Sequence, residues 1–134
     1  MKGTEDQLWL RQAQDDYRFG RAALAGRFHA QACFIAQQVA EKAVKAVHYK
    51  RSGRPVIGHS VQVLLKRLNA RAQVTEDLVT LGGELDQFYV STRYPDALPG
   101  VVPSDAFSAL QARSALRAAS KILRWATIQM RRQG

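Results

Sequence analysis

Four long polar side chains recur at helical intervals within residues 28–49, FHAQACFIAQQVAEKAVKAVHY. They are Gln38, Glu41, Lys42 and Lys45, and in a helix they would project from one side. Four long polar side chains on one side of a buried helix can form a binding face. The same side chains can also form a solvated face with a Glu41–Lys45 pair at i, i+4. The spacing leaves both interpretations open.

The segment that carries these side chains is predicted to be one long helix. It is rich in alanine and contains neither glycine nor proline, so nothing in it interrupts a helix. A second, apolar stripe at the same intervals should face the core. Its members are Ala32, Ala36, Val39, Ala43 and Val47. The single cysteine, Cys33, lies among apolar residues and is expected to be an inert, packed thiol.

Charge is distributed unevenly along the chain, whose net charge is +9 over 134 residues. Residues 51–74 carry five basic and no acidic side chains, and residues 104–134 carry six basic and one acidic. Residues 75–103 reverse this, with one basic and five acidic side chains. Two basic segments around an acidic one fit a polyanionic ligand or an acidic partner surface. Basic charge also promotes solubility by itself, so the pattern does not decide between these roles.

Length and composition indicate one globular domain over residues 1–134, because 46% of the residues are hydrophobic. No apolar run approaches the length needed to cross a bilayer, so no membrane association is expected. The N-terminal segment lacks an apolar signal core, and a cytoplasmic location is expected. The three histidines have no ligand-like spacing, so neither a metal nor a cofactor is expected.

Helices are the only elements predicted, because strand alternation and hairpin turn pairs are absent. The first helix should begin near Thr4 or Asp6, either of which can cap it, and should end at Gly26. The long helix follows. Residues 51–60 contain two glycines and a proline and should therefore interrupt the helical pattern.

Two further helices should precede a long loop. The third should cover residues 60–70, with Ser60 or His59 as its cap. The fourth should begin after Thr75, and its Gly82-Gly83 pair indicates close helix packing or a kink.

The loop over residues 91–105 contains three prolines and is predicted to be stiff, and Ser104 should cap a last helix that runs to about Arg132. The expected fold is all-α, a bundle of about five helices with a long proline-rich loop before the last one.

Two segments, FIAQQVAEKAVKA at 34–46 and LDQFYVSTRYPDALPGVVP at 85–103, occur together with GHS at 58–60 between them. With these segments the chain resembles the HEPN domain family over most of its length. The pairing of QQxxEKxxKA with a downstream YxxTRYPD is more specific than either motif alone.

This resemblance implies an up-and-down helical bundle that binds a nucleotide or nucleic acid such as RNA. It also implies association, as a homodimer or larger assembly, and frequent work beside a minimal nucleotidyltransferase, in pairs that include toxin–antitoxin systems. The positions that match the family pattern are Gln37, Gln38, Glu41, Lys42, Lys45, His59, Tyr89, Arg93, Tyr94, Pro95 and Asp96.

The chemistry of these residues suits a phosphate-bearing ligand. Arg93 can contact a phosphate with two N–H groups, and Tyr89 or Tyr94 can stack on a base. We expect Lys42, Lys45 and Arg93 to lie close together, with Glu41 and Asp96 orienting them. In the alternative interpretation, Arg93 and Asp96 pair with Glu41 and Lys42 and only pin the loop to the bundle.

One branch of the family consists of ribonucleases, whose motif is an arginine, four to six residues and a histidine, late in the chain. No histidine follows Arg93 in this sequence, so no catalytic residue is assigned and enzymatic activity is not favoured. Arg54 and His59 have the motif's spacing, but at a different place in the chain. Three hypotheses follow: a non-catalytic nucleotide- or RNA-binding protein with a nucleotidyltransferase partner, a metal-independent ribonuclease toxin, and a structural dimerisation or interaction domain.

Overall fold

The structure is a computed structural model that describes residues 3–94, 96 and 100–132. Within these ranges the chain forms helices and no strand, which confirms the predicted all-α class. None of these helices combines the length and apolarity that crossing a bilayer requires. The α-helices are α1 (Glu5–Ala25), α2 (His29–Ser52), α3 (Val61–Lys66), α4 (Glu76–Asp86), α5 (Phe88–Ser91), α6 (Pro103–Ala106) and α7 (Ala109–Arg131), and a 3₁₀ turn, η1 (Ala70–Ala72), lies between α3 and α4.

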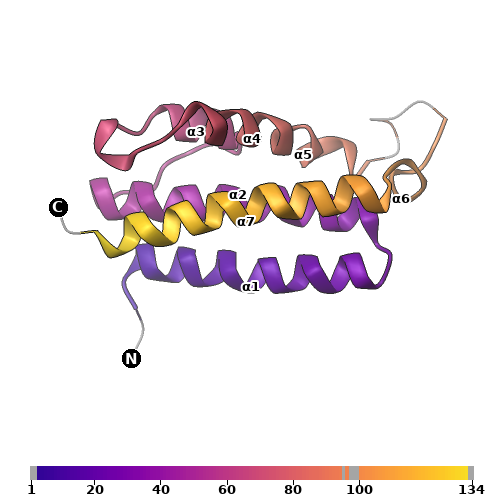
Figure 1. Cartoon of the computed structure of the whole chain (residues 1–134), viewed down its shortest axis with the longest axis horizontal. Helices are drawn as coiled ribbons and strands as arrows, with labels where there is room; N and C mark the ends of the chain where they lie inside the picture. The colour runs from indigo at the N-terminus through magenta and orange to yellow at the C-terminus, as the bar shows by residue number, and fades with distance from the viewer. Residues whose placement is uncertain (1–2, 95, 97–99, 133–134) are drawn as a thin grey trace.

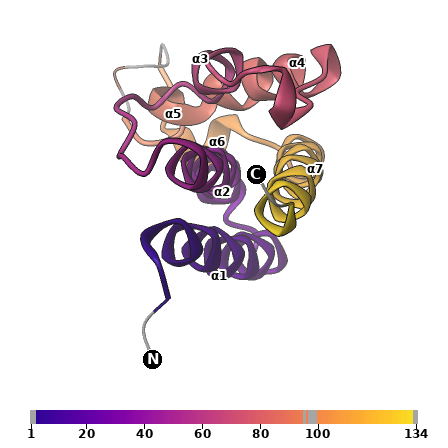
Figure 2. The ribbon, with the colours of Figure 1, turned by 90° about the vertical axis from the view of Figure 1, so that its left-hand side faces the viewer.

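The helices form three layers around α2 (Figures 1 and 2). Helix α1 lies on one side, α2 and α7 run side by side in the middle, and α3, α4 and α5 cover the other side. Helices α1 and α2 run in opposite directions because the connection between them, residues 26–28, is short, whereas α7 runs in the same direction as α2 (Figure 1). Helix α2 is therefore enclosed on several sides. Two residues of its polar stripe, Glu41 and Lys45, are buried, and the other two, Gln38 and Lys42, are partly buried.

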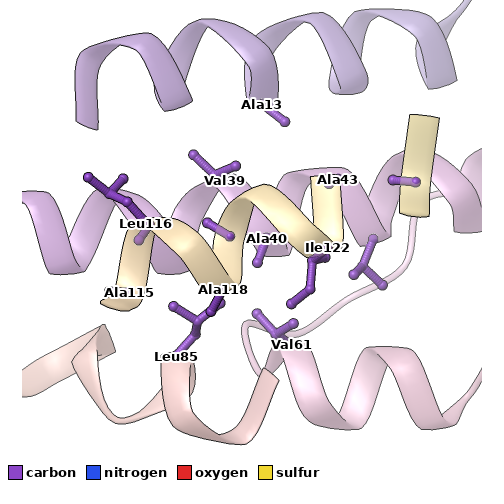
Figure 3. Packing of buried hydrophobic residues seen from close by; sticks show 14 of the residues in the cluster. Ala13, Val39, Ala40, Ala43, Val61, Leu85, Ala115, Leu116, Ala118 and Ile122 are labelled. Atoms are coloured by element: carbon purple, nitrogen blue, oxygen red, sulfur yellow. The ribbon is translucent and has the colours of Figure 1, made fainter. Parts of the chain in front are cut away.

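Small side chains line the contact between the long helices (Figure 3). The apolar stripe predicted on α2 is confirmed, because all five of its residues are fully buried. In the close-up, Ala40 and Ala43 of α2 lie beside Ile122 of α7, while Val61 and Leu85 close the core from α3 and α4. Alanines at these positions allow the helix backbones to approach closely and bury apolar area with little loss of side-chain entropy.

Several predicted helix ends are confirmed. Thr4 forms a capping box with Gln7, and the hydroxyl groups of Ser60 and Thr75 accept hydrogen bonds from the first turns of α3 and α4. Gly26 follows the last residue of α1 as predicted. The third helix is shorter than expected: α3 ends at Lys66, and η1 follows.

The prediction that Ser104 caps the last helix is wrong. Pro103 begins the short α6, Phe107 then adopts an extended conformation (φ −114°, ψ 135°), and α7 begins only after Ser108. Ser108 accepts a hydrogen bond from the backbone of Gln111, whose side chain accepts one from the Ser108 backbone. This capping box satisfies two helix-end N–H groups, which Ser104 alone could not do.

Candidate functional site

Glu41 of α2 is the centre of a buried polar network. It is only 4% exposed, and its Oε2 lies 3.2 Å from Lys45 Nζ and 3.2 Å from His59 Nδ1. Lys45 is itself 8% exposed, so the predicted i, i+4 pair forms in the interior rather than in solvent. Gln38 Nε2 also approaches Glu41 Oε1, at 3.4 Å. Several donors around one buried carboxylate offset the cost of removing its charge from water.

Two hydrogen-bonding residues hold the segment before α3, which carries His59. The fully buried Gln37 donates from Nε2 to the carbonyl of His59 at 2.8 Å and accepts from Gln38. Asp86 of α4 accepts hydrogen bonds from Ser60 Oγ and Val61 N, both at 2.7 Å. The carboxylate of Asp86 thus caps the beginning of α3. His59 is therefore fixed from α2 on one side and from α4 on the other.

A cation and four rings lie next to this network. Arg93 Cζ is 4.4 Å from the centre of the Phe34 ring, 4.7 Å from that of Tyr89 and 5.1 Å from that of Tyr94. The ring of His59 stacks on Tyr89, with centres 5.0 Å apart and planes at 17°. The side chain of His59 is 59% exposed and Tyr94 is 49% exposed. We call Phe34, His59, Tyr89, Arg93 and Tyr94 the Arg93 cluster.

Arg93 is held by aromatic rings and backbone rather than by a carboxylate. Its Nε donates to the carbonyl of Tyr89 at 2.8 Å, and the residue is exposed. No carboxylate among the described residues lies within 4 Å of its guanidinium group. The described contacts therefore show neither of the ion pairs in the pinning interpretation, Arg93 with Glu41 and Asp96 with Lys42. Within the described part of the chain, the hydrogen bond of Arg93 to Tyr89 uses Nε and not the terminal nitrogens.

Lys42 and Asp96 lie outside this connected set. Lys42 forms an ion pair with Asp16 of α1, and Asp16 also accepts a hydrogen bond from Gln12. Asp96 is exposed and takes part in no ion pair within the described part of the chain. Pro95 lies outside the described residues. The structure thus joins Gln38, Glu41, Lys45, His59, Tyr89, Arg93 and Tyr94 through successive contacts.

Sequence reasoning assigned no role to Phe34, Asp86 or Trp9. Phe34 precedes Gln38 by four residues, so its helical spacing could have placed it beside the polar stripe. Trp9 of α1 lies under Lys45, whose Nζ is 5.6 Å from the indole ring centre, and this contact has no local sequence signal. Arg54 and His59, the pair with ribonuclease-like spacing, make no hydrogen bond to each other within the described ranges. His59 instead contacts Glu41 and Tyr89.

Comparisons with known proteins agree with the fold. A family model, the HEPN domain, matches residues 7–129. The crystal structure of the protein TT1696 from Thermus thermophilus is similar with a TM-score of 0.91 and 38% identity, covering 95% of this chain and 99% of that one.

Two further crystal structures are also similar. An archaeal HEPN homologue, ST0689, has a TM-score of 0.75 and 33% identity, covering 98% of this chain and 100% of that one. An HEPN domain protein of Thermotoga maritima, tm0613, has a TM-score of 0.73 and 34% identity, covering 93% and 98%. No curated protein matches the chain.

Proposed function

The chain belongs to the HEPN domain family, and we propose that it is a non-catalytic member that binds a nucleotide or RNA at the Arg93 cluster. The observation that carries the proposal is an exposed guanidinium group stacked against three aromatic rings, with no carboxylate among the described residues to neutralise it. A guanidinium group that no carboxylate neutralises can bind phosphate oxygens through its planar fork of N–H donors.

The parts of the cluster have complementary roles in this proposal. The planar guanidinium group of Arg93 offers two parallel N–H donors to a phosphate. The exposed rings of His59 and Tyr94 provide faces on which a base can stack. Glu41, itself paired with Lys45, contacts the ring of His59 and holds it in place, so the stacking surface is fixed before the ligand arrives.

The binding proposal is tested by calorimetric titration of the protein with ATP and with a short single-stranded RNA. Arg93→Ala should weaken binding about tenfold or more, because it removes the phosphate contact and one stacking surface. Arg93→Lys should recover only part of the loss, since an ammonium group cannot make the planar two-point contact. Arg21→Ala, an exposed arginine on α1, serves as the control. Equal affinities of the wild type and Arg93→Ala would overturn the proposal.

The proposal assigns no catalytic residue. His59 is the one histidine of the cluster, and its Nδ1 is engaged by Glu41, which suits a fixed stacking ring. Labelled single-stranded RNA incubated without metal should therefore remain intact. Cleavage that is lost in both His59→Ala and Arg54→Ala would replace this proposal with the ribonuclease alternative.

We also propose that the protein acts as a homodimer or larger assembly beside a minimal nucleotidyltransferase, in a pair of the toxin–antitoxin type. The family membership supports this proposal, and a bundle of this size gains buried area on association. Light scattering on the protein, alone and mixed with a nucleotidyltransferase encoded beside it, tests both parts. A monomer mass for the protein alone would contradict the homodimer, and unassociated proteins in the mixture would contradict the nucleotidyltransferase partner.

A further inference from the structure

Helix α7 carries a row of cations and no acidic residue over its whole length, ALQARSALRAASKILRWATIQMR. Arg113, Arg117, Lys121 and Arg124 follow one another at intervals of four, four and three residues, and all four are exposed. With 3.6 residues per turn they fall within a sector of about 80° and extend over about 16 Å of the helix. We call these four residues the α7 ridge.

The charges of the α7 ridge are not balanced within the described part of the protein. None of its four residues takes part in an ion pair there. Glu84 of α4 lies near the neighbouring flank of α7, where it lines a hollow with Gln111 and Ser114, and it too forms no such pair. Like charges about one helical turn apart repel each other, so the ridge favours contact with an anion.

The α7 ridge is separate from the Arg93 cluster. Figure 2 shows α7 along one side of the molecule and α5, which precedes Arg93, toward the other. The opposite face of α7 contributes Leu116 and Ile122 to the core and is fully occupied. The contacts of the Arg93 cluster therefore do not account for the α7 ridge, and any ligand of the ridge would bind on a separate face.

We propose that the α7 ridge binds the sugar–phosphate backbone of a single RNA strand. This inference rests on the proposed function, because it takes the ligand of the protein to be an RNA rather than a free nucleotide. Successive cations are about 6 Å apart along the helix axis, which presents a regular row of positive charge to a regular row of phosphates. Three of the four residues are arginines, whose planar fork suits phosphate oxygens.

Other occupants fit the α7 ridge less well. A second copy of the same ridge would place cations against cations, which disfavours self-association through this face. A protein interface is usually centred on aromatic or other apolar side chains, with few charges in the middle. The ridge has the reverse composition, since its four residues are all cationic. An acidic protein partner is therefore an outcome that the experiment below can reveal, rather than the occupant proposed.

The test is fluorescence anisotropy of a labelled oligouridine of about twenty nucleotides at several salt concentrations. Arg117→Glu with Lys121→Glu reverses the two central charges. Arg11→Glu with Arg21→Glu makes the same change in net charge on exposed positions of α1. We expect the ridge variant to lose about tenfold or more in affinity at low salt. Its plot of log affinity against log salt should be less steep by about 1.4, because two phosphate contacts at about 0.7 each are removed.

The control variant should bind the RNA with an affinity within about threefold of the wild type. Its slope of log affinity against log salt should equal that of the wild type. Equal losses in the two variants would show an effect of net charge alone and overturn the proposal, as would unchanged binding by the ridge variant or no RNA binding by the wild type. Titration with ATP keeps the two proposals distinguishable. If ATP binding depends on Arg93 while the ridge variant binds RNA normally, the ridge proposal fails and the proposed function stands.

Discussion

Glu41 carries its charge in the interior of the protein, where a carboxylate is stable only with close partners. Lys45 and His59 supply these partners from two directions, one from the same helix and one from the segment before α3. The residue thereby connects the core to the exposed Arg93 cluster, since His59 stacks on Tyr89 and Tyr89 lies beneath Arg93. Substitution of Glu41 should therefore lower the stability of the fold.

Glu41→Gln keeps the shape of the side chain but leaves Lys45 as a buried, unpaired cation. We expect the free energy of unfolding to fall by about 3 kcal/mol in urea denaturation. The matched control is Asp15→Asn, which removes the carboxylate from the exposed pair with Arg18. That change should cost less than about 1 kcal/mol. Similar effects of the two substitutions would show that the pair of Glu41 and Lys45 is not a buried ion pair in solution.

Cys33 is fully buried, and burial raises the pKa of its thiol from 9.0 to about 12. The native thiol therefore stays protonated at a pH where the unfolded chain loses this proton. Cys33 should contribute stability below about pH 9 that is lost as the pH rises toward 12, at no more than about 1.4 kcal/mol per pH unit. The difference in unfolding free energy between the wild type and Cys33→Ala should shrink across this window. A difference between these two free energies that stays constant over this pH range would contradict the prediction.

Local chemistry predicted most helix ends, and it failed where two candidate caps competed. Ser104 and Ser108 are both able to cap the last helix, but only Ser108 has a glutamine three residues later that completes a capping box. Gly82 and Gly83 indicated close packing, and the structure confirms it against α3. The sequence could not show which of the two glycines makes the contact, because that depends on how α4 is rotated.

Gly82→Ala and Gly83→Ala should separate a backbone contact from a side-chain contact. A Cβ at Gly82 would lie 3.1 Å from Gln62 N and from Val61 Cγ1, whereas one at Gly83 would meet the flexible end of the Gln62 side chain. Gly82→Ala should destabilise by about 1 kcal/mol, since overpacking outweighs the helix propensity of alanine. Gly83→Ala should stay within about 0.5 kcal/mol of the wild type. Thermal unfolding measures the loss of stability in each variant. A larger loss in Gly83→Ala than in Gly82→Ala would contradict this prediction.

At the scale of the whole molecule, the contacts that build the site join residues far apart in the sequence. Spacing within α2 predicted the pair of Glu41 and Lys45. It could not place Lys42 against Asp16 rather than near Arg93, because that depends on which flank of α2 faces α1. The stacking of His59 on Tyr89 likewise depends on Asp86 holding the segment before α3 against α4. These contacts depend on how the helices pack against one another, which the periodicity of the sequence does not specify.

The uneven charge along the sequence becomes two separate surfaces in the fold. Four of the six basic residues of the C-terminal segment form the α7 ridge on the exposed side of α7. Arg93, the single cation of the acidic segment, lies among aromatic rings near α5. One surface presents a row of charges and the other presents one charge with stacking faces. The first suits a polymer backbone and the second a nucleotide unit, which is consistent with an RNA ligand.

A chemical-shift footprint shows whether a nucleotide binds at the Arg93 cluster. The ¹⁵N-labelled protein is titrated with ATP while the backbone amide resonances are followed. We expect saturable shifts concentrated at Phe34, His59 and residues 89–94, with no change at the outward positions of α1, and we expect these shifts to be lost in Arg93→Ala. Saturable shifts confined to another surface, or the same footprint in Arg93→Ala, would show that the nucleotide does not bind at the Arg93 cluster.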